Sequence, residues 1–276
     1  MIINTEIITS RNNPLVKWVC TLHDKKGREA SKAFIAEGAK LTLEALEAGL
    51  PVTHIFLSSS RKDIYLDSIM SKSKSGSEDN IAVIILDDSV FEKISTEKAP
   101  QGVISVIKYL DFFSYIDIIY KEEFYLDKNE RTIILCSVRD PSNLGAVIRS
   151  AVAFGTDRIY LSEDCADIYN PKTVRSAMGS LFRVKVTRVS SLSGLIKSLQ
   201  ENGRRVFAAE LSKGAVSLLD MSIKSTDCFM IGNEGHGIPR EIASLCDGSV
   251  FIPISKRTES LNASVAAAIF MWEQSK

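Results

Sequence analysis

Short apolar runs alternate with longer amphipathic segments along most of the chain. Between residues 37 and 107 the pattern predicts helices over 37–48, 63–70 and 87–94, and strands over 53–57, 81–86 and 102–107. Helices that alternate with buried strands indicate a small α/β domain. The Ser-, Lys- and Gly-rich stretch 72–80 is predicted to be a loop within that domain.

A second alternation begins at Thr132 and predicts a doubly wound α/β unit. Its predicted strands cover 132–138, 158–161, 184–186, 205–209, 228–231 and 249–252. Its predicted helices cover 146–154, 170–179, 192–201 and 263–272, with a further helix starting at Pro239 and a turn over 139–145. We therefore predict a first domain over 1–107, a connector with a short helix over 108–130, and a second domain over 131–276.

Three polar turns each follow or flank a predicted strand of the second domain. They contain Asn143 with Arg149, Glu234 within the glycine turn 232–237, and Ser260 with Asn262. Ligands in open α/β sheets bind beyond the carboxyl ends of the strands, so one common site is expected. Helix capping by Asn, Ser or Glu, and a structural ion pair for Arg149, are the alternatives. Arg149 lies in an otherwise apolar helix, where a guanidinium without a partner is unfavourable.

The net charge and the distribution of basic residues indicate which class of partner the protein binds. Lys plus Arg and Asp plus Glu are both 34, which argues against a general polyanion-coating protein. Residues 11–32 nevertheless hold six basic and two acidic side chains, and residues 172–188 hold five basic and no acidic ones. Such runs are commonly solvated helix faces, but together they suggest a nucleic-acid surface. The predicted RNA contacts are Arg11, Lys17, Lys25, Lys26, Arg28, Lys172 and Arg175.

Cysteine and histidine usage disfavours metal and disulfide chemistry. The five cysteines are scattered without CxxC spacing, and the three histidines do not pair at ligand spacing. A reduced, cytoplasmic protein without a metal is expected. The N-terminus does not resemble a signal peptide, and no apolar run is long enough to cross a membrane.

Together, the three turns resemble the motifs of the SpoU (TrmH-like) branch of the SPOUT RNA methyltransferases. The resemblance rests on Asn143-x-Gly145 with Arg149, Gly232-Asn233-Glu234-Gly235, and Ile252-Pro253 with Ser260-Leu261-Asn262. Residues 170–179 also resemble the family segment between the first two motifs. Residues 34–38 and 100–103 more loosely resemble the L30e-like RNA-binding domain found in this family.

The resemblance implies an α/β fold with a deep trefoil knot in the second domain, behind an L30e-like first domain. It implies a homodimer through the C-terminal domain, for which the apolar last helix is suitable. The implied reaction is 2′-O-methylation of a ribose in structured RNA with S-adenosylmethionine as the cofactor, and 23S ribosomal RNA is favoured over tRNA. A non-catalytic RNA-binding protein is the alternative. A dinucleotide-dependent enzyme is disfavoured because the glycine turn is not G-x-G-x-x-G.

The resemblance also implies roles for individual residues. The cofactor contacts are expected at Gly232, Ile252, Leu261, Glu210, Leu211, Asn233, Pro253 and Ile254. The expected catalytic set is Arg149, Asn143, Glu234, Ser260 and Asn262. A guanidinium is a poor base, so Arg149 is expected to hold an RNA phosphate and to stabilise the developing alkoxide. The chain departs from the family at Lys256, where Gly is frequent.

Overall fold

The computed structural model describes residues 1–72, 81–110, 113–116 and 129–276. It divides into two compact units, Met1–Leu110 with Asp167–Phe182, and Asp111–Ala166 with Arg183–Lys276. The segment Asp167–Phe182 therefore belongs to the first unit, although it interrupts the second in sequence. The sequence-based boundaries at 107 and 131 do not anticipate this excursion.

The first unit contains a five-stranded mixed sheet in the order β1-β4-β3-β5-β2. Its strands are β1 (Ile2–Ile8), β2 (Ala33–Glu37), β3 (Val52–Ser58), β4 (Ala82–Leu86) and β5 (Val103–Lys108). β1, β4 and β3 are parallel, whereas β5 runs antiparallel to β3 and β2. The helices are α1 (Pro14–Thr21), α2 (Lys25–Ser31), α3 (Ala39–Glu47), α4 (Lys62–Lys72), α5 (Asp88–Ile94) and α7 (Pro171–Ala177), followed by the 3-10 helix η1 (Met178–Phe182).

The three strands and three helices predicted between residues 37 and 107 are confirmed, while β1 and β2 were not predicted. The predicted helix at 37–48 begins later, because Glu37 ends β2 and Gly38 takes a positive φ of 111° before α3. Phe56, Phe91 and Ile104 are buried between the sheet and the helices α1 and α5. This core packs α1 and α5 against the sheet of the first unit.

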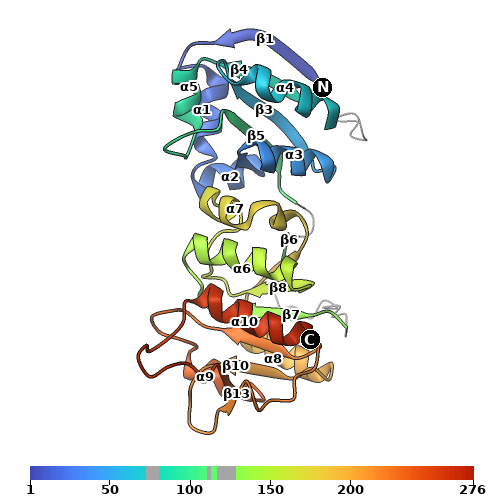
Figure 1. The fold of residues 1–276 in the computed structure, drawn as a ribbon, viewed down its shortest axis with the longest axis vertical. Helices are drawn as coiled ribbons and strands as arrows, with labels where there is room; N and C mark the ends of the chain where they lie inside the picture. The colour runs from blue at the N-terminus through green and yellow to red at the C-terminus, as the bar shows by residue number, and fades with distance from the viewer. Residues whose placement is uncertain (73–80, 111–112, 117–128) are drawn as a thin grey trace. The chain divides into compact units, whose positions relative to one another are not determined.

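The second unit contains an eight-stranded, fully parallel sheet in the order β11-β13-β10-β12-β7-β8-β9-β6. Its strands are β6 (Phe113–Ile116), β7 (Thr132–Leu135), β8 (Arg158–Leu161), β9 (Lys185–Val189), β10 (Val206–Ala209), β11 (Val216–Ser217), β12 (Cys228–Ile231) and β13 (Gly248–Phe251). The helices are α6 (Pro141–Ala153), α8 (Leu192–Glu201), α9 (Arg240–Ala243) and α10 (Ala263–Ser275). Figure 1 shows α10 lying along α6, against which it packs.

The turn predicted over 139–145 is shorter than expected. Asp140 caps α6 by accepting hydrogen bonds from the backbone N–H groups of Ser142 at 2.8 Å and Asn143 at 3.0 Å, and Pro141 occupies the first helical position. Asn143 therefore lies inside the first turn of α6 rather than before the helix. β7 ends at Leu135, before Ser137 adopts a left-handed φ of 58°.

The connector 108–130 differs from its prediction where the structure describes it. In its described part, Lys108 is the last residue of β5, and the strand β6 pairs with β9 and so extends the second sheet. The short helix predicted within the connector has no counterpart in its described part, and residues 117–128 lie outside the described residues, as do residues 73–80 of the predicted loop. In the part of the chain that is described, no helix is long and apolar enough to cross a membrane.

Parallel pairing brings the carboxyl ends of four strands to the same edge of the second sheet. Leu135 pairs with Ile231, and Ala209 pairs with Val250. The chain leaves this edge through the three polar turns singled out from the sequence and through Glu210 and Leu211. The fold therefore gathers segments that are more than a hundred residues apart.

Candidate functional site

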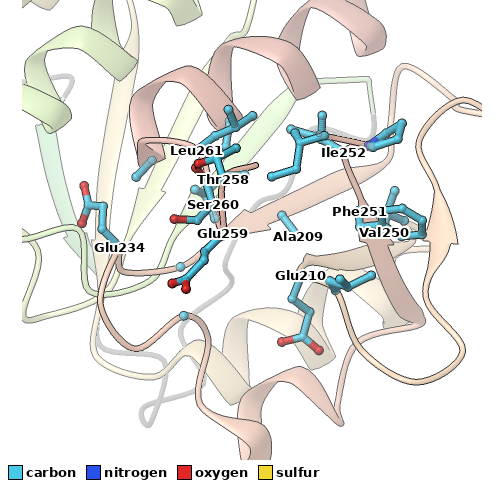
Figure 2. A pocket seen from close by; sticks show the side chains of 18 of the residues that line it. Ala209, Glu210, Glu234, Val250, Phe251, Ile252, Thr258, Glu259, Ser260 and Leu261 are labelled. Atoms are coloured by element: carbon cyan, nitrogen blue, oxygen red, sulfur yellow. The ribbon is translucent and has the colours of Figure 1, made fainter. Parts of the chain in front are cut away.

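A cavity of about 490 Å³ opens beyond the carboxyl ends of β10, β12 and β13. All eight residues expected to contact a cofactor line it, together with Glu234 and Ser260 from the expected catalytic set. In Figure 2, Ile252 and Leu261 stand along the top of the cavity, and Glu210 and Glu234 come from two neighbouring loops. Its volume is within the range of small-molecule sites.

The glycine turn 232–237 closes on itself at the cavity wall. Asn233 and Gly237 exchange two backbone hydrogen bonds, of 3.2 and 2.8 Å. A Cβ atom on Gly232 would lie 2.5 Å from the carbonyl carbon of Gly237, too close for any side chain. Asn233 donates from Nδ2 to the carbonyl of Ser137 at 2.9 Å and accepts from the Gly235 N–H at 2.8 Å. Gly232 is therefore required by the turn itself, besides any approach to a ligand.

A chain of amide hydrogen bonds joins the three predicted motifs. Asn262 caps α10 through Oδ1, which accepts from the Ser264 N–H at 2.9 Å. Its Nδ2 therefore faces Asn143 and donates to Asn143 Oδ1 at 3.0 Å. Asn143 Nδ2 in turn donates to the carboxylate of Glu234. The cap fixes which end of the Asn262 side-chain amide faces Asn143. Each hydrogen bond of the series is therefore donated toward Glu234, which is the last acceptor.

Arg149 differs from the expectation that placed it in an apolar helix facing a partner. Its side chain is exposed on α6 and has no hydrogen bond or ion pair to any residue that the structure describes. It does not line the cavity, and neither do Asn143 and Asn262. The argument from desolvation was wrong for this residue, since its guanidinium stays in solvent. An exposed guanidinium free of partners is available to bind a phosphate.

Polar groups beneath the first motif hold the end of β7 in place. Ser137 donates its N–H to Ser162 Oγ at 2.8 Å, and Ser162 Oγ donates to Asp164 at 2.7 Å. Burial raises the pKa of the Asp164 carboxyl, but hydrogen bonds from Ser162 and Arg139 outweigh burial and lower it to about 2. Burial raises the pKa of the Cys136 thiol to about 11, which disfavours the thiolate at neutral pH. These hydrogen bonds fix the chain between β7 and α6.

The cavity is lined by more acids than bases. Glu210, Glu234 and Glu259 contribute carboxylates, and Lys256 is its only basic lining residue. Glu210 is held by Ser249, whose hydroxyl donates to it at 3.0 Å. Glu259 was not among the residues predicted for the site, although it directly precedes Ser260 in the same polar turn. Its position in that turn was the signal that could have identified it.

The basic segment 11–32 is not one free surface. Arg28 is 1% exposed, pairs with Asp167 at 2.6 Å, and donates to the carbonyls of Leu22 at 2.9 Å and His23 at 2.7 Å. Arg11 donates to the carbonyl of Ser89. The prediction of an RNA contact is wrong for Arg28, because its buried guanidinium already forms hydrogen bonds and an ion pair inside the first unit.

The remaining predicted RNA contacts are exposed. Lys17 and Lys26 lie in solvent, and Lys25 makes only a solvent-exposed pair with Glu29 at 3.7 Å. On α7, Lys172 is exposed and Arg175 pairs with Glu97. In the second unit, Arg188 donates to four backbone carbonyls and Lys185 pairs with Glu130, so the run 172–188 is partly structural.

Metal chemistry receives no support from the described residues, among which no group of three His, Cys, Asp or Glu side chains could hold an ion. The site instead consists of an apolar and acidic cavity, a directed amide chain and a free arginine.

Comparison with known proteins agrees with this arrangement. Residues 130–272 match the SpoU rRNA Methylase family, and residues 13–105 match the MRM3-like substrate binding domain. The chain belongs to the SpoU rRNA methylase family. The three motifs that line or adjoin the cavity all fall within the stretch that matches the SpoU methylases.

Individual SpoU-type relatives match nearly the whole chain. The 23S rRNA (guanosine(2553)-2′-O)-methyltransferase RlmP of Bacillus subtilis (strain 168) is 30% identical over 265 residues, 96% of this chain and 97% of the relative. The 23S rRNA (uridine(2479)-2′-O)-methyltransferase of Streptomyces viridochromogenes is 28% identical and covers 96% of this chain and 90% of its own. The structure of the AdoMet-bound rRNA methyltransferase from Sinorhizobium meliloti aligns with a TM-score of 0.80 and 28% identity, over 98% of this chain and 97% of that one.

Proposed function

We propose that this protein transfers a methyl group from S-adenosylmethionine to the 2′-hydroxyl of a ribose in 23S ribosomal RNA. The observation that carries the proposal is the convergence of all eight expected cofactor contacts on one cavity at the carboxyl edge of the second sheet. The names of the RlmP relative and of the Streptomyces viridochromogenes relative support ribosomal RNA as the substrate class.

The cavity suits a positively charged cofactor. Its lining contains three carboxylates and one lysine, and an acidic wall favours the sulfonium and ammonium groups of S-adenosylmethionine. The apolar side chains of Ile252 and Leu261 flank the space in which we place the cofactor. When bound, S-adenosylmethionine supplies an activated methyl group. The AdoMet-bound Sinorhizobium meliloti structure supports this choice of cofactor.

The residues around the cavity would align the ribose. We assign Arg149 to an RNA phosphate and to the developing alkoxide, because its guanidinium has no described partner and offers a planar set of donors. The chain from Asn262 through Asn143 holds Glu234 at the cavity wall, where it positions neighbouring polar groups. Ser260 and Asn262 would fix the hydroxyl and the loop. Alignment of this kind supplies a large part of a methyl-transfer rate.

The first unit is proposed to recognise RNA without chemistry. None of its described residues lines the cavity, and its exposed Lys17, Lys25, Lys26 and Lys172 are suited to a phosphate backbone. We keep 1–107 for recognition and 131–276 for the knotted, catalytic domain, except that Asp167–Phe182, which includes Lys172, goes with the recognition unit. We place the protein in the cytoplasm, in keeping with the proposed ribosomal RNA substrate.

A homodimer through α10 completes the proposal. The helix buries Phe270 against Phe229 but leaves Val265 47% and Trp272 50% exposed, seven residues apart on one face. An apolar stripe of this kind is typical of an interface. Val265→Glu and Trp272→Glu should therefore give soluble monomers in light scattering. Phe270 is unsuitable for this test, because it lies in the core.

The proposal is tested on the full chain, because Asp167–Phe182 folds with the first unit and β6 precedes residue 131. Calorimetry should show binding of S-adenosylmethionine, and incubation with unmodified 23S rRNA transcript should create one mapped 2′-O-methyl site. Methylation of tRNA transcripts alone would move the substrate to tRNA. Cofactor binding absent from a folded, dimeric protein would leave the RNA-binding alternative.

A further inference from the structure

A tight turn at the cavity mouth presents two adjacent cations. Thr258 N–H donates to the carbonyl of Ser255 at 3.2 Å, and Arg257 N–H donates to Ser255 Oγ at 3.3 Å. Lys256 and Arg257 thus occupy the two central positions of the turn, from which side chains project outward. Both are exposed, and Lys256 lines the cavity.

These two side chains differ from several arginines of the second unit, which are held in ion pairs. In the described part of the second unit, Arg139 pairs with Asp164, Arg158 with Glu130 and Arg205 with Asp227. Neither Lys256 nor Arg257 makes a side-chain hydrogen bond or an ion pair with a described residue, although three carboxylates line the same cavity. Their charges are therefore available to a partner outside the chain.

The acidic lining of the cavity indicates what these two cations could do. A ribose can enter only with its flanking phosphates, and these meet an edge that carries Glu210, Glu234 and Glu259. Repulsion between phosphates and carboxylates opposes that approach. Two unpaired cations on one turn at the mouth offset the repulsion and fix the backbone beside the target.

We propose that Lys256 and Arg257 bind the RNA phosphates that flank the target ribose, so that the catalytic unit grips its substrate independently of the first unit. This inference rests on the proposed function. It predicts an ionic contribution to substrate binding that is located at the active site.

The test compares Lys256→Ser/Arg257→Ser with Lys224→Ser. Lys224 is also exposed and makes no ion pair with a described residue, but it precedes β12, at the opposite edge of the sheet. The KM for unmodified 23S rRNA transcript is measured from about 50 to 200 mM KCl. The double variant should raise KM about tenfold and flatten its log–log salt slope by about 1.5, since each lost phosphate contact removes roughly 0.7–0.9.

The affinity for S-adenosylmethionine, measured by calorimetry, should stay within about twofold in the double variant, and Lys224→Ser should match the wild type in both assays. An unchanged salt slope in the double variant would overturn the inference. So would weakened cofactor binding with an unchanged KM for RNA, which would assign Lys256 to the cofactor carboxylate. Failure of the wild type to bind cofactor or to methylate RNA would instead remove the proposed function.

Discussion

From the sequence, both the loops around the cavity and the basic segment 11–32 were predicted to be functional. The structure brings the loop residues together but separates the basic residues of 11–32 into buried and exposed ones. The cavity gathers Glu210, Gly232, Ile252 and Leu261 from three separate loops. Residues 11–32 are contiguous, yet Arg28 is buried while Lys26 is exposed. Polar residues at strand ends are brought together by parallel pairing, whereas neighbours on a helix point in different directions. Position relative to a sheet was therefore a better guide to function than local charge.

The largest effect is expected at Arg149. Arg149→Ala should lower kcat by about 10²–10³-fold, the usual loss when one group that stabilises transition-state charge is removed. Cofactor affinity should hardly change, since Arg149 does not line the cavity. Single-turnover methyl transfer and calorimetry measure the two quantities. Full activity in this variant would remove Arg149 from the mechanism.

Arg149→Lys separates positioning from proton transfer. Lysine keeps the charge but lacks the planar fork that grips a phosphate, so a positioning role predicts a rate nearly as low as that of alanine. A role as base predicts recovery that grows with pH. The pH–rate profile of Arg149→Lys on the natural RNA distinguishes these outcomes.

A loss of stability, rather than of RNA binding, is expected at Arg28. Arg28→Ala leaves Asp167 and two backbone carbonyls without their partner, which should lower the free energy of unfolding by about 3 kcal/mol. Lys26→Ala, on the same helix but exposed, should change it by less than about 0.5 kcal/mol. Urea denaturation compares the two. Equal stability of both variants would contradict the structural role of Arg28.

Gly232 and Gly235 lie in the same turn but differ in the space available to a Cβ atom, so their alanine variants can be compared directly. Gly232→Ala places a methyl group 2.5 Å from backbone, and the strain of about 1–3 kcal/mol should weaken cofactor binding about 10- to 100-fold. Gly235→Ala meets only the Asn233 side chain at 3.4 Å and should bind cofactor almost normally. If calorimetry finds the two variants alike, the closed turn is not what shapes the cavity.

Asn262→Asp tests the direction of the amide chain. Aspartate still caps α10, so the melting temperature should move by no more than about 2 °C. It cannot donate to Asn143, whose amide would then lose its fixed orientation toward Glu234. We expect a fall in kcat of about tenfold with little change in cofactor affinity. An unchanged kcat would show that the chain is not needed for turnover.

The smallest effect is expected from the exposed lysines of α2. Lys25→Glu/Lys26→Glu should weaken RNA binding severalfold and flatten its salt dependence, because fewer counterions are released. Cofactor affinity should stay the same, since neither residue lines the cavity. An equal loss of cofactor binding would contradict a separate recognition unit.

Much of the fold could be predicted from residue pattern. The parallel α/β order of the second unit followed from buried strands alternating with helices, and the cavity followed from polar turns at strand ends. The strands β1 and β2 were missed, because their neighbours carry mixed polar and basic residues that resemble a helix face. The early start of α6 was missed because Asp140 was not recognised as its cap.

By itself, the sequence determined that the three motif turns meet at one edge of the second sheet, because parallel pairing brings the strand ends together there and the motifs follow strands. Only the tertiary structure decided which charges are free. Arg28 and Arg188 donate to carboxylate or carbonyl groups within the chain, whereas Arg149, Lys256 and Arg257 remain in solvent. The reason is physical: a guanidinium pairs with whatever carboxylate or carbonyl lies within reach, and reach depends on packing between segments distant in sequence.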